Sequence, residues 1–489
     1  MILYITGMLM LVEAALLMIP VLVALVYGDN TLPAFLLPAI FLAVCGISFS
    51  IVAKPRTKSL SSSDGMFMVA AGWVILSFFG GLPFYISDEI PSLIDATFEA
   101  VSGFTTTGAT ILNDVESLSH SVLFWRSFTH WLGGMGVLVF LMAILPLAGG
   151  SGNLKLMKAE SPGPDVGKLV PKSRATAKIL YSIYLALTVA EFISLLICRL
   201  GFFNSACMAL GTAGTGGFGL LNDSCASYSP AVKIVLTVFM TLFGVNFNIY
   251  YLIICGKIRS ALKSEELKAY FGIYFAAVFL IAVNIRSIYA SAGETLITSF
   301  FQVSSVMTTT GFSTVDFNLW PEFCRVLMVI VMCIGGSAGS TAGGFKVARV
   351  MLLVKNARKE LKSIAQPRAV NVVTFEGKRV SNEVIRNTNV YFLLYVLIFV
   401  ASLFAVSFDK MDSISNITGV IATLNNIGPG LNVVGPAGNF AEYSVFSKLV
   451  FIADMLIGRL EIYPILLMLF PTFFKHTRPR AKAHLDEED

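Results

Sequence analysis

Apolar residues gather along this chain in long stretches, and polar or charged residues are confined to the segments between them. A helix of about 18 or more apolar residues is long enough to cross the hydrocarbon core of a bilayer. The pattern predicts such spans near residues 2–27, 35–53, 66–86, 117–148, 176–200, 229–256, 267–290, 320–354, 384–408 and 442–474. We therefore expect an all-helical protein that crosses a membrane many times.

From residue 66 onward the pattern repeats four times. Each repeat has a spanning stretch, an apolar segment too short to span, a polar loop with glycine, and a second spanning stretch. When one glycine of each loop is placed in register, the short segments align too, and such coincidences argue for internal duplication. The aligned glycines are Gly108, Gly217, Gly311 and Gly428. The predicted units are a leading two-helix hairpin at 1–58, four pore repeats at 59–158, 159–262, 263–368 and 369–475, and a cytoplasmic tail at 476–489.

The four loops, which we call the filter loops, have the composition of an ion path. Non-helical backbone is tolerated at membrane depth only where protein buries it or where it lines a water-filled cavity. A ring of carbonyl oxygens can replace the water of a dehydrated cation. Glycine permits the turn that aims them inward, and the C-terminus of each short helix adds negative charge. The predicted path consists of Thr106, Thr107, Gly108, Gly216, Gly217, Thr309, Thr310, Gly311, Asn426, Ile427 and Gly428.

The alternative role for these glycines is close packing of membrane helices. That alternative places glycines at a spacing of four within spanning helices. These glycines lie instead in polar loops flanked by Thr or Asn, after helices of half the spanning length. The sequence therefore favours a pore over a packing motif.

Composition and charge define the class and the orientation. With 56% hydrophobic and 13% charged residues, the chain has too little polar surface to cover a water-soluble globule. Most of the 35 Lys and Arg residues lie in alternate loops, and such loops stay on the cytoplasmic side. This places both termini in the cytoplasm and the filter loops on the opposite face, where acidic residues would concentrate cations.

Motifs for other chemistry are absent or out of context. Residues 214–219 match GxGxxG, but no strand precedes the match and no acidic residue suited to ribose follows it. No Walker A sequence occurs, and the four histidines lack the spacing of metal ligands. We expect no enzyme activity, no organic cofactor and no nucleic-acid partner.

The chain resembles the TrkH branch of the Trk/Ktr/HKT potassium transporter superfamily over essentially residues 1–475. The four loops, the two extra leading helices and the cytoplasmic segment 159–164 carry this resemblance. It implies a pseudo-fourfold pore in each subunit, a homodimer in a bacterial inner membrane, and a cytoplasmic nucleotide-binding regulatory subunit of the TrkA kind.

The resemblance also implies potassium as the transported ion. In plant relatives a serine in the first loop is associated with sodium preference, and the first loop here has none at that position. A sodium-permeable or sodium-coupled cation transporter of the same architecture stays open as the alternative. The implied potassium contacts are Thr107, Gly108, Gly216, Gly217, Thr310, Gly311, Ile427 and Gly428.

A glycine-rich stretch at 335–344 interrupts the span predicted at 320–354. Glycine costs roughly 1 kcal/mol against alanine in a helix, so the stretch should unwind readily. Its GxxxGxxxG spacing is also typical of helix packing, and the sequence leaves both interpretations open. The resemblance implies an intramembrane gating loop at this place. The predicted gating residues are Gly336, Gly339, Gly343, Gly344, Lys346 and Arg459.

Arg459 lies within the span predicted at 442–474, where a buried arginine costs about 2.5–3.5 kcal/mol and needs partners or water. A structural salt bridge to Asp454 or Glu461 and an electrostatic barrier in the pore explain it equally well. Outside the membrane, basic segments are candidate docking surfaces for an acidic partner. Topology signals and contacts with anionic membrane lipid are equally open explanations. These segments are 149–178, 346–386 and 475–482.

Overall fold

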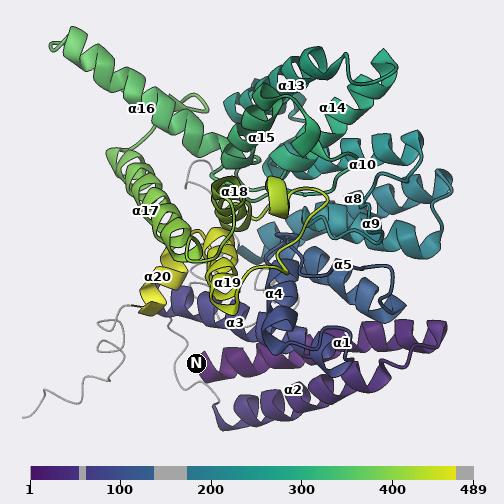
Figure 1. Cartoon of the computed structure of the whole chain (residues 1–489). Coiled ribbons are helices and arrows are strands. Elements are labelled where there is room, and N and C mark those ends of the chain that lie inside the picture. The colour runs from purple at the N-terminus through teal and green to yellow at the C-terminus, as the bar shows by residue number, and fades with distance from the viewer. Residues whose placement is uncertain (1, 54–61, 137–172, 370, 470–489) are drawn as a thin grey trace, which may run out of the picture.

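Helices account for most of the protein. The computed structural model describes residues 2–53, 62–136, 173–369 and 371–469, which are coloured along the chain in Figure 1. Two long helices, α1 (Ile2–Tyr27) and α2 (Leu32–Val52), open the chain and pack against each other as a hairpin. Among the described residues, six helices are long and apolar enough to cross a membrane, and a bent pair adds a seventh only if it is counted as one span. The fold is that of a multi-pass membrane protein.

Four units of three helices follow the hairpin. Each begins with a long helix: α3 (Ser62–Ile86), α8 (Ser173–Ile197), α13 (Glu265–Ile285) and α17 (Asn382–Val406). A shorter inner helix comes next: α4 (Leu93–Phe104), α9 (Phe202–Gly214), α14 (Ala292–Met307) and α18 (Ser413–Leu424). A third helix follows each loop: α5 (His120–Gly134), α10 (Pro230–Phe243), α15 (Glu322–Ile334) and α19 (Val445–Arg459).

The inner helices form the interior of the protein. Three of them begin with a side chain that accepts a hydrogen bond from a backbone N–H of the first turn, which otherwise lacks a partner. These capping residues are Ser92, Ser291 and Asp412. The fourth inner helix, α9, begins after Gly201 without such a cap. Toward their C-termini the inner helices are buried almost completely, so each ends in the middle of the protein.

The third helix of each unit is too short to cross the membrane alone, which corrects the sequence prediction. Its 13 to 15 residues reach about 22 Å at about 1.5 Å per residue, less than the roughly 30 Å of the hydrocarbon core. The single span predicted at 229–256 is wrong, because α11 (Phe247–Ile254) turns away from α10 by 89°. The span predicted at 442–474 is also broken. Glu461 and Ile462 take φ values of 58° and 68° before α20 (Tyr463–Leu469) begins.

The glycine-rich stretch does interrupt the third unit, as predicted. Residues 335–346, which we call the glycine-rich loop, separate α15 from α16 (Val347–Ala365). Since this stretch is not helical, its glycine spacing is not a helix-packing motif here. Several other predictions lie outside the described residues. They are the part of span 117–148 beyond residue 136, the part of span 442–474 beyond residue 469, the unit boundaries after residues 58, 158 and 475, the segment 159–164 and the tail 476–489.

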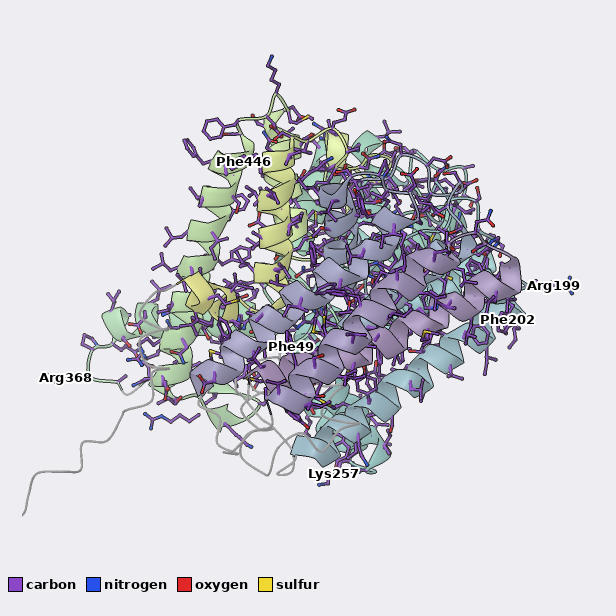
Figure 2. The ribbon with its side chains drawn as sticks, turned by 90° about the horizontal axis from the view of Figure 1, so that it is seen from below. Phe49, Arg199, Phe202, Lys257, Arg368 and Phe446 are labelled. Atoms are coloured by element: carbon purple, nitrogen blue, oxygen red, sulfur yellow. The ribbon has the colours of Figure 1, made fainter. Side chains whose placement is uncertain are left out.

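The remaining elements are short connections. They are α12 (Ile258–Lys263), the antiparallel strands β1 (Thr374–Phe375) and β2 (Lys378–Arg379), and the 3-10 turns η1 (Phe317–Leu319) and η2 (Asn432–Val434). Helix α16 extends away from the helical body (Figure 1). Large apolar side chains such as Phe49, Phe202 and Phe446 are exposed on the outside (Figure 2), where lipid would contact them.

Candidate functional site

The four filter loops share one backbone conformation. The residue two positions before each aligned glycine has a φ of 55° or 56°, in the left-handed region that only a few per cent of non-glycine residues adopt. These residues are Thr106, Thr215, Thr309 and Asn426. The aligned glycines themselves have φ values between 75° and 96°. Such a coincidence at four places supports the alignment made from the sequence, and it adds Thr215, which the sequence analysis did not single out.

The same hydrogen bond fixes each loop to its inner helix. The residue before the aligned glycine donates its N–H to the carbonyl five residues earlier, at 2.8–3.0 Å. The four donor and acceptor pairs are Thr107 and Ser102, Gly216 and Gly211, Thr310 and Ser305, and Ile427 and Ala422. Each inner helix therefore ends in a tight turn that reverses into the loop, with its C-terminus toward the loop.

The four loops close into a ring. A Cβ atom placed on Gly108 would collide with the carbonyl oxygen of Gly216, which precedes the aligned glycine of the second loop. The corresponding atom on Gly217 would collide with the Thr310 carbonyl, and that on Gly311 with the Ile427 carbonyl. On Gly428 it would lie 2.9 Å from the Thr107 carbonyl, which returns to the first loop. The structure thus brings together all four predicted loops, and only glycine fits this close contact.

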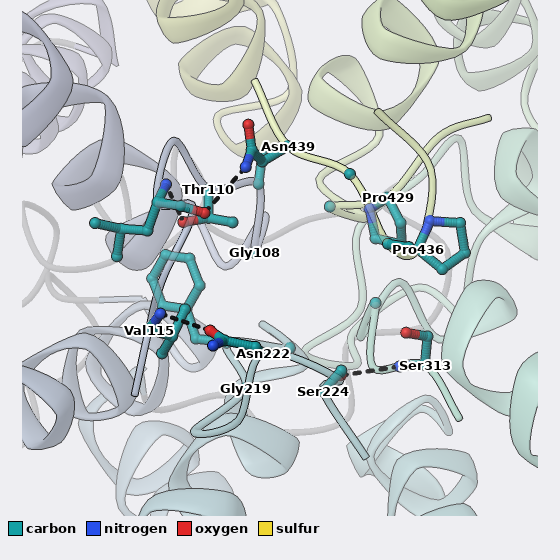
Figure 3. A pocket seen from close by; sticks show the side chains of 18 of the residues that line it. Gly108, Thr110, Val115, Gly219, Asn222, Ser224, Ser313, Pro429, Pro436 and Asn439 are labelled. Atoms are coloured by element: carbon teal, nitrogen blue, oxygen red, sulfur yellow. Dashed lines mark hydrogen bonds between the residues drawn. The ribbon is translucent and has the colours of Figure 1, made fainter. Parts of the chain in front are cut away.

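A cavity of about 130 Å³ lies on one side of the ring (Figure 3). All four aligned glycines line it, together with residues of the segments that follow each loop. Hydrogen bonds between these segments stabilise the cavity wall. The Val115 N–H donates to Asn222 at 2.7 Å, and the Ser313 N–H donates to the Ser224 hydroxyl at 3.2 Å.

A carboxylate lies beside this cavity. The carboxylate of Asp114 accepts a hydrogen bond of 2.9 Å from the side chain of Asn222, which lines the cavity. This hydrogen bond holds the pKa of Asp114 below its ordinary value. The carboxylate therefore stays ionised near neutral pH, and an ionised carboxylate beside the opening attracts cations.

The glycine-rich loop contacts two of the four filter loops. The Gly343 N–H donates to the Thr309 hydroxyl at 2.6 Å, and the Gly344 N–H donates to the Asn425 carbonyl at 2.9 Å. Its far end is tied to the bend between α10 and α11. There the Ser337 N–H donates to the Gly244 carbonyl, and the Phe247 N–H donates to the Gly339 carbonyl, both at 3.0 Å.

Two basic side chains hold this loop in place. Lys346 is buried and donates to the Ala342 carbonyl within the loop. Arg459, the last residue of α19, donates to the Thr341 carbonyl at 3.0 Å. Arg459 also donates to the carbonyls of Gly133, and of Gly134 at 2.8 Å, at the end of α5. It therefore joins the glycine-rich loop to a different unit of the protein.

Each of the two carboxylates considered for Arg459 from the sequence has another partner in the structure. Asp454 accepts a hydrogen bond of 2.6 Å from Ser402, and Glu461 pairs with Arg349. The prediction that Arg459 lies within a continuous helix is wrong, because α19 ends at this residue. A position at a helix end lets the guanidinium reach across to the backbone of other units.

The sequence analysis missed a group of side chains behind the first and second loops. Glu99 and Arg126 form a buried ion pair at 2.8 Å, and His130 lies one helical turn beyond Arg126. One signal was present: Glu99 is a charge within an apolar segment, and a buried charge is found paired. The partner could not be identified, because it depends on the packing of α4 against α5.

The protein repeats one unit four times, and each unit has a long helix, a re-entrant inner helix, a loop and a third helix. The loops share one ring of backbone carbonyls. This arrangement defines a class of polytopic membrane proteins with a central four-loop ring. The family model named TrkH and described as a cation transport protein matches residues 37–283 and 278–474. The chain belongs to this family.

Relatives of similar length support the assignment. The chain is 36% identical to the Trk system potassium uptake protein TrkH of Escherichia coli, covering 96% of this chain and 98% of that protein. It is 31% identical to an uncharacterized cation transporter of Methanocaldococcus jannaschii, covering 98% and 96% of the two chains. The crystal structure of the potassium transporter TrkH from Vibrio parahaemolyticus superposes with a TM-score of 0.86 at 33% identity, covering 97% of this chain and 99% of that one.

Proposed function

We propose that this protein takes up potassium across a bacterial inner membrane through the ring of four filter loops. The observation that carries the proposal is the closed ring itself, in which each aligned glycine abuts the carbonyl before the next. A cation that leaves water needs its hydration oxygens replaced, and carbonyls from four loops supply them. The relatives named as potassium uptake proteins support potassium as the ion.

In this proposal the ion passes from the outer cavity through the ring. Four inner helices direct their C-termini at the loops and so contribute partial negative charge toward a cation. The ion contacts are the predicted ones: Thr107, Gly108, Gly216, Gly217, Thr310, Gly311, Ile427 and Gly428. Thr106, Thr309 and Asn426 complete the path on the inner side, together with Thr215.

The glycine-rich loop is the gate in this proposal. Its contacts with Thr309 and the Asn425 carbonyl place it directly against the ring. The residues that control it are Gly336, Gly339, Gly343, Gly344, Lys346 and Arg459. An ion that passes the ring needs this loop displaced, so breaking the Arg459 contacts favours conduction.

Regulation comes from a partner on the cytoplasmic side. The relatives' names refer to a Trk system, and we propose a TrkA-like nucleotide-binding subunit that docks on the basic cytoplasmic segments. We also propose a homodimer, with both termini in the cytoplasm. The positive-inside distribution of Lys and Arg supports this orientation.

Ion flux by the purified protein in liposomes tests the proposed function. We expect the potassium flux to exceed the sodium flux and to need no sodium gradient. Equal flux of the two ions, or potassium flux only with sodium present on the same side, would overturn the proposal in favour of a sodium-permeable or sodium-coupled transporter. A parallel measurement with an imposed proton gradient separates passive from proton-linked transport.

A further inference from the structure

Two helices of the first unit, α4 and α5, contact each other through buried polar groups. Glu99 and Gly103 lie four residues apart on α4, and Arg126 and His130 lie four residues apart on α5, so each pair shares one face of its helix. Arg126 donates its Nε to Glu99 at 2.9 Å, and its Nη2 lies 2.8 Å from the same oxygen. His130 Nδ1 lies 2.8 Å from the Gly103 carbonyl. These contacts are almost completely shielded from solvent.

Both α5 side chains also reach the second filter loop. Arg126 Nη1 donates to the Gly219 carbonyl at 3.3 Å, and His130 Nε2 accepts the Phe218 N–H at 3.3 Å. Because Nε2 is the acceptor, the proton of a neutral imidazole resides on Nδ1 and is donated to Gly103. The Phe218 ring lies 4.1 Å from the Arg126 guanidinium and 4.2 Å from the His130 ring.

Glu99 extends the same group of contacts to the first filter loop. Its carboxylate accepts the Thr110 hydroxyl at 3.0 and 3.1 Å and the Ile111 N–H at 3.2 Å. These residues directly follow Gly108 and the first loop. The His130 ring, in turn, lies against Gly216, where a Cβ atom would collide with it. One network therefore holds residues on both sides of the contact between the first and second loops.

The basic residues at the similar place in the other three units are used differently. Lys233 donates to the Ala226 carbonyl at 2.7 Å, and Lys448 pairs with Asp95. Arg325 pairs with the exposed carboxylate of Glu322 and donates to the side chain of Asn432 at 3.2 Å. None of these contacts involves a residue within two positions of an aligned glycine. The network is thus a feature of the first and second loops and not of the repeat as such.

We propose that Glu99, Arg126 and His130 are positioning residues that set the preference for potassium over sodium. They do so by fixing the distance between the carbonyls of the first and second loops. A carbonyl ring that can contract by a few tenths of an ångström fits the smaller sodium ion as well as potassium, whereas a braced ring does not. The inference rests on the proposed function, since selectivity has meaning only if the ring conducts.

The test compares potassium and sodium flux by purified variants in liposomes. We expect Arg126→Gln and His130→Leu to lower the potassium-to-sodium flux ratio by about tenfold, the effect of one lost charged or buried hydrogen bond, while potassium flux changes less. His130→Gln, whose amide can donate and accept, should recover part of the ratio. A role in stability alone would change the unfolding temperature but not the ratio.

Lys233→Gln is the matched control, because it removes a basic residue of the second unit that lies outside the network. If Arg126→Gln fails to fold, the double variant Glu99→Gln/Arg126→Gln leaves no unpaired buried charge and takes its place. Folded variants with the wild-type ratio, or an equal loss in Lys233→Gln, would overturn the inference while the proposed function stands. Wild-type protein without potassium flux would instead overturn the proposed function.

Discussion

The first and second filter loops differ from the third and fourth in what supports them. Buried side chains of Glu99, Arg126 and His130 hold the first two loops. The third and fourth loops are contacted by main-chain N–H groups of the glycine-rich loop, through the Thr309 hydroxyl and the Asn425 carbonyl. The backbone of the ring is fourfold, but these contacts differ between its first and second halves, which are joined where the Asn426 side chain donates to the Thr107 hydroxyl at 2.9 Å.

Repeats that share one backbone conformation can therefore have different functions. Side chains of two packed helices make a support that cannot be withdrawn without breaking the core. A glycine-rich loop tied by a few hydrogen bonds can leave without such a cost, since each net hydrogen bond contributes about 0.5–1.5 kcal/mol. We infer that selectivity depends most on the first half of the ring and gating on the second.

Substitution of the aligned glycines should change ion selectivity most. It tests whether the space between each glycine and the neighbouring carbonyl is equally small at all four positions. We expect Gly108→Ser to lower the potassium-to-sodium flux ratio by at least about tenfold, because its Cβ collides with the Gly216 carbonyl. Gly428→Ser should have a smaller effect, since the nearest carbonyl is 2.9 Å from its Cβ position. Flux of both ions in liposomes is the measurement. Equal ratios for the two variants would contradict the ring as described.

Arg459→Gln should have the next largest effect and tests the proposed gate. It removes charged hydrogen bonds to carbonyls in the glycine-rich loop and at the end of α5. We expect potassium flux to rise by about tenfold, since a hydrogen bond to a charged group contributes about 1.5–3 kcal/mol. The ion ratio should stay at the wild-type value. Lower flux together with a changed ratio would show that Arg459 acts on the ring instead.

Thr309→Val removes a single acceptor from the contact between the ring and the glycine-rich loop. Losing one neutral hydrogen bond corresponds to about 1 kcal/mol, so we expect potassium flux to rise by about fivefold. Thr309→Ser keeps the hydroxyl and serves as the control with wild-type gating. Single-channel or liposome flux measurements at equal protein density distinguish the two variants. Identical behaviour of Val and Ser would remove this contact from the gate.

The smallest effect concerns the stability of the folded protein in acid. It compares α18, which has a side-chain cap, with α9, which has none. Partial burial alone would raise the pKa of Asp412, but hydrogen bonds from Ser415 and Asn432 outweigh it and hold the pKa below its ordinary value. A lowered pKa contributes stability above about pH 4 that is lost as the pH falls through the folded-state value.

Asp412→Ala should therefore lower the free energy of unfolding by about 1 kcal/mol at pH 7, as loss of a helix cap does. The difference from wild type should shrink below about pH 4 and be smallest below the folded-state pKa, where Asp412 is protonated in both folded and unfolded states. Asp412→Asn keeps a capping oxygen and serves as the control. Thermal unfolding in detergent at several pH values measures both. A substitution at the start of α9 should not lower the free energy of unfolding in this way, because α9 begins after Gly201 without a side-chain cap.

The sequence predicted the helical membrane fold and the four aligned glycines, because both depend on local patterns. It did not predict where the third helices end. Apolar residues continue from α10 into α11, and the bend there is held by contacts of Gly244 and Phe247 with the distant glycine-rich loop. The turn at Glu461 and Ile462 lies between Gly458 and Pro464, but the apolar residues on both sides of it made one continuous span the simpler prediction.

The support of the first two loops was also beyond the sequence. Arg126 was recognisable as a basic residue near the start of its helix, and His130 only as a histidine without metal-ligand spacing. Their roles depend on contacts with residues about 27 and 90 positions away, such as Gly103 and Phe218. A single-sequence pattern contains no information about which distant backbone groups such side chains meet.

Because all four loops of the ring belong to one polypeptide, each can evolve separately. In a tetramer of identical subunits one substitution alters every quarter of the ring at once. Here a substitution alters one quarter, and the chain already shows the result: the first and third loops read Thr-Thr-Thr-Gly, while the fourth reads Asn-Asn-Ile-Gly. Natural selection can therefore adjust such a ring in small steps while three quarters of it stay intact.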